Sequence, residues 1–226
     1  MRLAVLFSGG KDSTYAAALM AQQGHELNRL VSIVPDDPDS WLFHTPNLHL
    51  LPSLASAIRV PLVIERSESN ESCELEALRK ALEGLDVDGV VAGAIASDYQ
   101  WDRYNGVCEG LGLRVFSPLW RKDQAMLLRD MADAGMRSII VRASAEGLDA
   151  SWLGRELDPK AIDELVALSR SKGINPSGEG GEYETLALDS PIHRYPLRIV
   201  EQKKITARDG GSLLVEKVSK GARKVR

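Results

Sequence analysis

Residues 3–13 read Leu3-Ala4-Val5-Leu6-Phe7-Ser8-Gly9-Gly10-Lys11-Asp12-Ser13, an apolar run followed by a short polar loop. Five consecutive apolar residues are typical of a strand that is buried on both faces of a parallel sheet. The residues after the loop, 15–21, have helical composition, and Gly24 is the expected end of that helix. A strand, a glycine-containing loop and a helix in this order indicate the first βαβ unit of a parallel sheet.

The same alternation continues to about residue 134. Strands are predicted at residues 30–34, 62–64, 89–95 and 115–116, and helices at 48–58, 71–82, 98–111 and 124–134. Such alternation predicts the α/β class, with a doubly wound parallel sheet and helices on both faces. Ligands of these sheets bind at the carboxyl ends of the strands near the switch point, so we expect the chemistry in the loops after the first, second and fourth strands.

The pattern changes beyond residue 135. A strand at 138–141 is followed by a helix at 159–172, with Asp158 as its N-cap and Pro159 in its first turn. Further strands are predicted at 186–188, 197–207 and 213–218, and Asp209-Gly210 is a hairpin signal before the last of these. We therefore expect a first domain at residues 1–135 and a smaller α+β region at residues 136–226.

Composition narrows the classes of function. The chain has 226 residues and a formal net charge of −4, which disfavours a general nucleic-acid-binding surface, so no nucleic-acid partner is expected. Its two cysteines, Cys73 and Cys108, form no CxxC pair and no zinc spacing, as is usual in a reducing compartment. No apolar stretch has the length of a membrane span, and the N-terminus lacks signal-peptide features. A cytoplasmic protein with no membrane partner is expected.

The loop at residues 8–13 has the chemistry of a phosphate site. Gly9 and Gly10 let the backbone approach a ligand closely, and the following helix presents unpaired N–H groups and a partial positive charge. Lys11 adds a cation, and Ser8 and Ser13 add hydroxyl donors. The order of residues is neither the GxxxxGK[ST] nor the GxGxxG pattern. The alternative is a tight turn in which Asp12 or Ser13 is only an N-cap.

This loop resembles the PP-loop, SGGxDS, of the ATP pyrophosphatases. That superfamily cleaves ATP between the α and β phosphates, and its fold is an adenine nucleotide hydrolase-like parallel sheet. The resemblance implies that Lys11, Asp12 and Ser13 are catalytic and that Asp12 binds Mg²⁺. The residues expected to bind ATP are Ser8, Gly9, Gly10, Lys11, Asp12 and Ser13, together with Ser32, Val34 and Gly93 at the ends of the second and fourth strands.

Three further stretches resemble the diphthine–ammonia ligase family. Residues 39–47, DSWLFHTPN, match its (D/E)SYMFHTPN stretch, with Trp41 and Leu42 in place of Tyr and Met. Residues 93–100, GAIASDYQ, match the family's GAIxSxYQ stretch. They are followed, as in the family, by Arg103, Cys108, LGL at 111–113 and PLW at 118–120. Residues 179–186, EGGEYETL, match a third signature. Where the family tends to read R-V-E, this chain has Arg103-Tyr104-Asn105. With the PP-loop included, the resemblance covers about residues 1–195.

The family resemblance implies an ATP-dependent ligase that converts diphthine on translation elongation factor 2 to diphthamide. The carboxylate would form an acyl-adenylate with release of pyrophosphate, and free ammonium would supply the nitrogen that displaces AMP. Two alternatives stay open at this point. One is a related enzyme that amidates or thiolates a metabolite or a tRNA, and the other is a sensor that binds ATP or AMP without turnover. The sequence also allows a homodimer.

Two groups of side chains are candidates for the substrate. His44, Asp98, Tyr99 and Arg103 follow the second and fourth strands, although His44 and Tyr99 also suit packing and Asp98 suits a helix cap. Glu179, Glu182 and Glu184, on one short stretch with Tyr183 and Thr185, are expected to hold Mg²⁺ or the quaternary ammonium of diphthine. In an extended stretch Glu182 and Glu184 would face the same side. The alternative for this stretch is a solvated acidic loop.

Overall fold

The computed structural model describes residues 1–36, 47–68, 70–207 and 210–222. In its first part, strands and helices alternate as β1 (Arg2–Leu6), α1 (Lys11–Gln22), β2 (Glu26–Pro35), η1 (Leu48–Leu50), α2 (Leu51–Ile58), β3 (Leu62–Ser67), α3 (Glu71–Leu82), β4 (Gly89–Val91), α4 (Asp98–Gly110) and β5 (Arg114–Phe116). The second part contains α5 (Gln124–Asp133), β6 (Arg137–Ala143), η2 (Ala150–Trp152), α6 (Pro159–Lys172), β7 (Tyr183–Asp189), β8 (Leu197–Ala207) and β9 (Gly210–Lys220).

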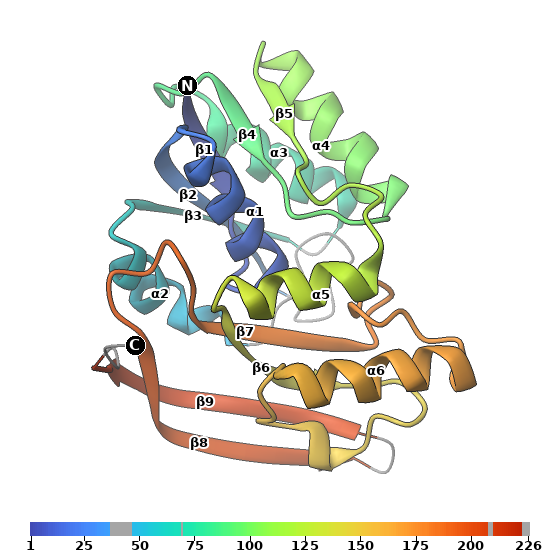
Figure 1. Ribbon diagram of the computed structural model, residues 1–226. Coiled ribbons are helices and arrows are strands. Elements are labelled where there is room, and N and C mark those ends of the chain that lie inside the picture. The colour runs from blue at the N-terminus through green and yellow to red at the C-terminus, as the bar shows by residue number, and fades with distance from the viewer. Residues whose placement is uncertain (37–46, 69, 208–209, 223–226) are drawn as a thin grey trace.

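Two sheets organise these elements. The first is parallel with the order β3-β2-β1-β4-β5, and the second is antiparallel with the order β7-β6-β9-β8. Figure 1 shows the first sheet in the upper half of the view and the second in the lower half. The expected α/β class with a doubly wound parallel sheet and a smaller α+β region is confirmed.

Helices cover both faces of the parallel sheet because its strands are apolar on both sides. On one face, Leu3 and Val5 of β1 belong to the core that contains α1 and α2. On the other face, Ala4 and Leu6 pack with the apolar residues of α3 and α4. Alternate residues of β1 therefore bury against opposite layers, as expected for a central strand.

The order in which strands are added to the parallel sheet reverses beside the central strand, β1. After β1 it proceeds outward through β2 and β3, and it then returns to place β4 on the other side of β1. The loops after β1 and β4 consequently lie next to each other at the carboxyl edge, the usual ligand position in such sheets. This is the arrangement that positions the site.

Several element boundaries differ from the sequence-based expectation, and two of these differences lie beside the carboxyl edge. Helix α1 begins at Lys11, so the last half of the polar loop is its first turn. Strand β4 ends at Val91 and not at residue 95, which leaves residues 92–97 as a loop before α4. The first difference shortens the irregular loop after β1, and the second lengthens the irregular loop after β4. Asp209 of the expected hairpin turn lies outside the described residues.

Helix α1 of the first part packs against β7 of the second part. Helix α5 packs beside α6, and Arg129 of α5 pairs with Asp163 of α6 at 3.0 Å (Figure 1). The residue 135/136 boundary falls between α5 and β6 and stays a prediction. In the part of the chain that the structure describes, no helix has the length and apolar character needed to cross a membrane.

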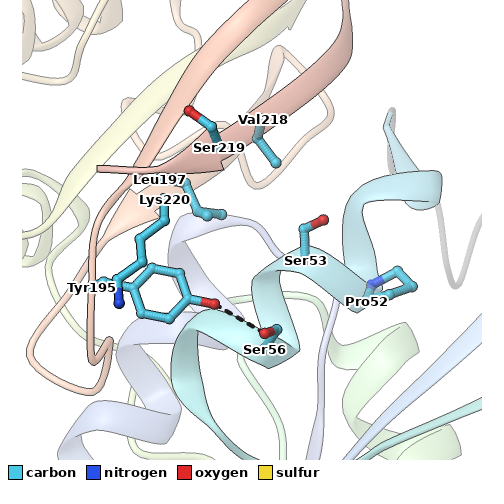
Figure 2. Close-up of a pocket in the computed structure, with 8 residues that line it drawn as sticks. All are labelled: Pro52, Ser53, Ser56, Tyr195, Leu197, Val218, Ser219 and Lys220. Atoms are coloured by element: carbon cyan, nitrogen blue, oxygen red, sulfur yellow. Dashed lines mark hydrogen bonds between the residues drawn. The ribbon is translucent and has the colours of Figure 1, made fainter. Parts of the chain in front are cut away.

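A pocket lies where α2 faces the β8–β9 hairpin. Figure 2 shows the hydroxyl of Tyr195 directed at Ser56, and the two oxygens are 2.9 Å apart. None of the pocket residues is among the site residues expected from the sequence. The lining residues are Pro52, Ser53, Ser56, Tyr195, Leu197, Val218, Ser219 and Lys220.

Asn47 links the chain before α2 to the second sheet. Its Nδ2 donates to the Leu213 carbonyl at 3.0 Å, and its Oδ1 accepts from Val215 N at 2.8 Å. The side chain is buried, and its φ of 68° lies in the left-handed region. Both the amide and this backbone conformation suit asparagine.

We expect Asn47→Gly to lower the free energy of unfolding by about 1–3 kcal/mol, because two buried hydrogen bonds to β9 are lost. Asn47→Ala should cost about 1 kcal/mol more, because alanine also disfavours the positive φ. Urea unfolding of the two variants against the parent chain measures both effects. An Asn47→Ala protein as stable as the parent would contradict this account.

Candidate active site

The phosphate-type loop is closed by its own hydroxyls. The Oγ atoms of Ser8 and Ser13 are 3.1 Å apart, and the Gly10 N–H donates to Ser8 Oγ at 3.3 Å. Gly9 has a φ of 79°, and a Cβ there would lie 2.6 Å from Leu54. Glycine is thus required at this position both for conformation and for space.

The N-terminus of α1 has no side-chain cap of its own. Gly10 is the N-cap residue, so the expected alternative in which Asp12 or Ser13 caps the helix is wrong. The reason is that a residue of the second part takes this role: Lys11 N donates to Thr185 Oγ1 at 3.1 Å. The N–H groups of a first helical turn lack intrahelical acceptors, and they form the anion-binding end of the helix.

Lys11 is a buried cation, with 3% of its surface exposed. Its Nζ donates to Asp12 Oδ2 at 2.8 Å and to the Ser177 carbonyl at 2.5 Å, and it lies 5.2 Å from the centre of the Tyr183 ring. Burial alone would lower the pKa of Lys11, but the charge and hydrogen bond of Asp12, together with the charges of Tyr183 and Glu179, outweigh burial and raise this pKa above its ordinary value. Lys11 therefore keeps its positive charge.

The two carboxylate oxygens of Asp12 differ. Oδ2 accepts from Lys11 Nζ, whereas Oδ1 has no hydrogen-bond partner among the described residues. Burial raises the pKa of the Asp12 carboxyl, and the neighbouring Lys11 ammonium opposes that rise. Its Oδ1 is buried, and it has no hydrogen-bond partner in the described parts of the chain. A buried carboxylate oxygen in this condition is suited to a cation.

Strand β7 docks directly on the loop. Besides the bond from Lys11 N to Thr185, the Ala187 N–H donates to the Gly9 carbonyl at 2.9 Å. Thr185 and Ala187 thus bind the loop from successive odd positions of one strand. The loop after β1 is held between its own sheet and β7 of the second sheet.

The loop after β4 closes on α1 from the other side. A Cβ on Gly93 would be 2.7 Å from Ser13 N and 2.9 Å from the Asp12 carbonyl carbon. Glu179 holds the same loop, because its Oε1 accepts from the N–H groups of Ile95, Ala96 and Ser97 at 3.0, 2.9 and 3.2 Å. The expected position of Gly93 beside the phosphate loop agrees with this geometry.

The three glutamates of the acidic stretch do not form a single site. Glu182 precedes β7, and its carboxylate accepts from Asn175 N and Nδ2 at 2.8 Å and from Gly180 N at 2.8 Å. Glu184 lies within β7, opposite Arg142 of β6. The expected common face of Glu182 and Glu184 stays a prediction. Within residues 1–36, 47–68, 70–207 and 210–222, no three His, Cys, Asp or Glu side chains converge to hold a metal ion.

Tyr183 is a core residue, with 2% of its surface exposed, and its hydroxyl donates to the Pro176 carbonyl at 2.7 Å. Burial raises the pKa of Tyr183, against the opposing charge of Lys11. The buried ring of Tyr183 makes a cation–π contact with the Lys11 ammonium. Its expected contact with a quaternary ammonium stays a prediction, as do the expected substrate contacts of Glu184 and Thr185.

Three further expected substrate residues, Asp98, Tyr99 and Arg103, lie on α4. Arg121 Nη2 donates to both oxygens of Asp98, at 2.6 and 2.8 Å. Glu71 accepts from the Tyr99 hydroxyl at 2.7 Å and from Arg103 Nε at 2.8 Å, and these two bonds lower the pKa of the Glu71 carboxyl. The structure brings Tyr99 and Arg103 together, and their role in substrate binding stays a prediction.

Three remaining residues are placed as follows. Ser32 is buried in β2 and donates from Oγ to the Phe7 carbonyl at 2.5 Å. Val34 lies in β2, two residues further along the strand. His44, with most of residues 39–47, lies outside the described residues.

Sequence reasoning missed two polar contacts of the loop at residues 175–182. Gln124 Oε1 accepts from the Ser177 hydroxyl at 2.8 Å, and Gln124 Nε2 donates to Asn175 Oδ1 at 3.3 Å. The Ser177 carbonyl also accepts a hydrogen bond from Lys11 Nζ. A glutamine at the start of a helix carries no local signal for such a role, whereas the glycines at 178, 180 and 181 do mark an unusual loop.

Gly93→Ala should lower the free energy of unfolding by about 1–3 kcal/mol, because its Cβ would overlap backbone atoms of α1 that cannot move away freely. The matched control is Gly106→Ala in exposed α4, where a Cβ meets nothing within 4 Å. That variant should gain about 0.5–1 kcal/mol from helix propensity. Urea unfolding compares them, and equal stability of the two variants would contradict the proposed close approach.

Two family models match this chain. The family model described as "Diphthamide synthase N-terminal domain" matches residues 1–115, and the one described as "Diphthamide synthase C-terminal domain" matches residues 123–220. A solved structure described as a "predicted subunit of tRNA methyltransferase" from Methanocaldococcus jannaschii has a TM-score of 0.47 at 15% identity. It covers 84% of this chain and 98% of that chain. This similarity is too low for any conclusion about function.

Curated relatives share much more of the sequence. The rat protein named diphthine–ammonia ligase is 36% identical over 86% of this chain and 81% of its own length. The human protein of that name is 35% identical over 86% of this chain and 81% of its own length. The bovine protein is 34% identical over 91% and 85%. With both family models and these relatives in agreement, the chain belongs to the diphthamide synthase family of diphthine–ammonia ligases.

Proposed function

We propose that this protein catalyses the ATP-dependent amidation of diphthine to diphthamide, with ammonium as the nitrogen donor. Diphthine is carried by translation elongation factor 2, which is the proposed protein substrate. The name of the relatives supports the reaction. The structural observation that carries it is a buried, charged Lys11 at the N-terminus of α1, between the loops after β1 and β4.

ATP enters this reaction as a substrate. The diphthine carboxylate oxygen bonds to the α-phosphorus, and the bond from that phosphorus to the bridging oxygen breaks, which releases pyrophosphate. Ammonia then bonds to the activated carbonyl carbon, AMP leaves with the electron pair of the carbon–oxygen bond, and one proton is lost. Negative charge grows on phosphate oxygens in the first step, so fixed positive groups accelerate it.

The residues of the chain supply those groups. Lys11 brings a full charge in a site that excludes water, where its effect is stronger than in solution. The amides at the start of α1 and the hydroxyls of Ser8 and Ser13 add donors at the same place. The bonds from β7 to this loop fix these donors before the substrate arrives, and such preorganisation is the main source of electrostatic catalysis.

Asp12 fits the magnesium ion that we propose for this site. Its Oδ1 is a buried oxygen that has no hydrogen-bond partner among the described residues. Mg²⁺ is commonly bound by one or two carboxylates together with substrate phosphates, so a single protein carboxylate is sufficient. The ion would neutralise charge on the pyrophosphate that leaves.

The test is product analysis with ATP, Mg²⁺, ammonium and elongation factor 2 carrying diphthine, with each component omitted in turn. We expect AMP and pyrophosphate only in the full mixture, with a decrease of about one mass unit in the substrate protein. Lys11→Met should lower the rate of AMP formation about a hundredfold or more, because the buried cation is lost from the charged transition state. Lys160→Met, at an exposed lysine of α6, should leave the rate unchanged.

Circular dichroism and urea unfolding establish that the Lys11→Met protein is folded before its rate is interpreted. An absence of AMP in every mixture, with a substrate protein of verified modification, would contradict the proposed function. So would AMP release that continues unchanged when ammonium and the diphthine protein are both omitted.

The thiol chemistry of the chain gives a separate prediction. Cys108 is completely buried, and burial raises the pKa of its thiol to about 11. The nucleophilic thiolate is therefore rarer at Cys108 than at an ordinary cysteine, so it is unsuited to a thiolation reaction. At about pH 8 we expect Ellman's reagent to modify one thiol per native chain, Cys73, and both after denaturation.

Cys73→Ser is the control, and it should leave no rapidly reacting thiol in the native protein. Rapid modification of two thiols in the native parent chain would contradict the assignment of Cys108 to the core.

A further inference from the structure

Glu179 makes an unusual set of contacts for a glutamate that was expected to bind substrate. One of its oxygens accepts hydrogen bonds from three consecutive backbone amides, those of residues 95, 96 and 97. These amides lie in the loop between β4 and α4, more than 80 residues away in the sequence. Hydrogen bonds to an ionised acceptor are about twice as strong as neutral ones.

The loop that carries Glu179 is stiffened by its own contacts. Glu182 accepts hydrogen bonds from Asn175 and Gly180. These bonds connect the two ends of the loop at residues 175–182. Gly178 has a φ of 76°, and a Cβ there would lie 2.8 Å from the Tyr183 carbonyl oxygen. A displacement at Glu179 is therefore transmitted to Ser177, two residues away.

Both ends of this connection reach the phosphate loop. On one side, Ser177 places its carbonyl 2.5 Å from Lys11 Nζ. On the other side, the loop held by Glu179 begins at Gly93, which fits against Ser13 N with no room for a Cβ. Arg121 N also donates to the Ile95 carbonyl at 2.7 Å, so the chain after β5 is hydrogen-bonded to the same loop.

From this connection we propose that Glu179 is a positioning residue for the ligase reaction. Its carboxylate fixes the loop after β4 and the loop at 175–182 relative to each other, and through them it fixes Lys11 and the first turn of α1. This inference rests on the proposed function. It gives Glu179 a role different from the expected contact with substrate.

The geometry favours positioning over direct substrate binding. If Glu179 turned toward a substrate cation, the three amides of residues 95–97 would lose their common acceptor. Buried N–H groups left without an acceptor are costly, so the carboxylate is held where it is. Replacing it should therefore disturb the phosphate loop and leave the affinity for the diphthine protein unchanged.

The experiment compares Glu179→Gln and Glu179→Ala with the parent chain, and Glu109→Gln is the control at an exposed glutamate of α4. Glutamine keeps an acceptor oxygen but not its charge, so we expect kcat for AMP formation to fall about tenfold, and about a hundredfold with alanine. KM for the diphthine protein should stay within about twofold of the parent value. Glu109→Gln should change neither constant.

Hydrogen exchange of the free protein supplies a second readout that needs no turnover. In Glu179→Ala the amides of residues 95–97 should exchange at least about tenfold faster, with core strand β1 unchanged as evidence that the protein is folded. Unchanged exchange at 95–97 would overturn the proposal. A rise in KM for the diphthine protein that is equal in the Gln and Ala variants, with kcat unchanged, would also overturn it, because that pattern identifies a substrate ligand.

The two hypotheses fail separately in this design. If the parent chain forms no AMP, the proposed function fails, and the exchange measurement still decides whether Glu179 fixes the loop after β4. If the parent chain is active and exchange is unaffected by Glu179→Ala, only the positioning role fails.

Discussion

A buried ammonium needs partners, and the partners of Lys11 come from both parts of the chain. Moving a charge out of water is expensive, and the cost is recovered only when close opposite charges and acceptors surround it. Asp12 supplies the charge from the same helix, while the Ser177 carbonyl and the Tyr183 ring come from the second part. The parallel sheet therefore cannot complete its own phosphate loop without the residues around β7.

The role of β7 extends this dependence to the backbone. Thr185 accepts from the first amide of α1, and Ala187 donates to Gly9 from the same strand. A helix N-terminus ordinarily obtains its cap from a residue just before it, because that residue is already close. Here a strand about 175 positions away provides it, so the loop after β1 is bound directly to the second sheet.

Much of this arrangement could be predicted from local patterns. Apolar runs and helical periods identified the strands and helices, and the alternation of the two predicted a parallel sheet with its chemistry after the first, second and fourth strands. The reach of Gln124 to Ser177 and of Glu179 to residues 95–97 could not be predicted in this way. Each is a side-chain bond across 50 or more residues, and no periodicity or cap signal within one element encodes such a bond.

The acidic stretch shows why spacing alone is an unsafe guide to a site. Glu179, Glu182 and Glu184 fall within six residues, and if the backbone were uniformly extended they would act together. Gly178 and Gly181 have positive φ, so the chain turns twice before β7 begins at Tyr183. Two of the carboxylates consequently bind different groups: Glu179 binds the loop after β4, and Glu182 binds amides of its own loop. The turns that these two glycines permit therefore determine which groups each carboxylate can contact.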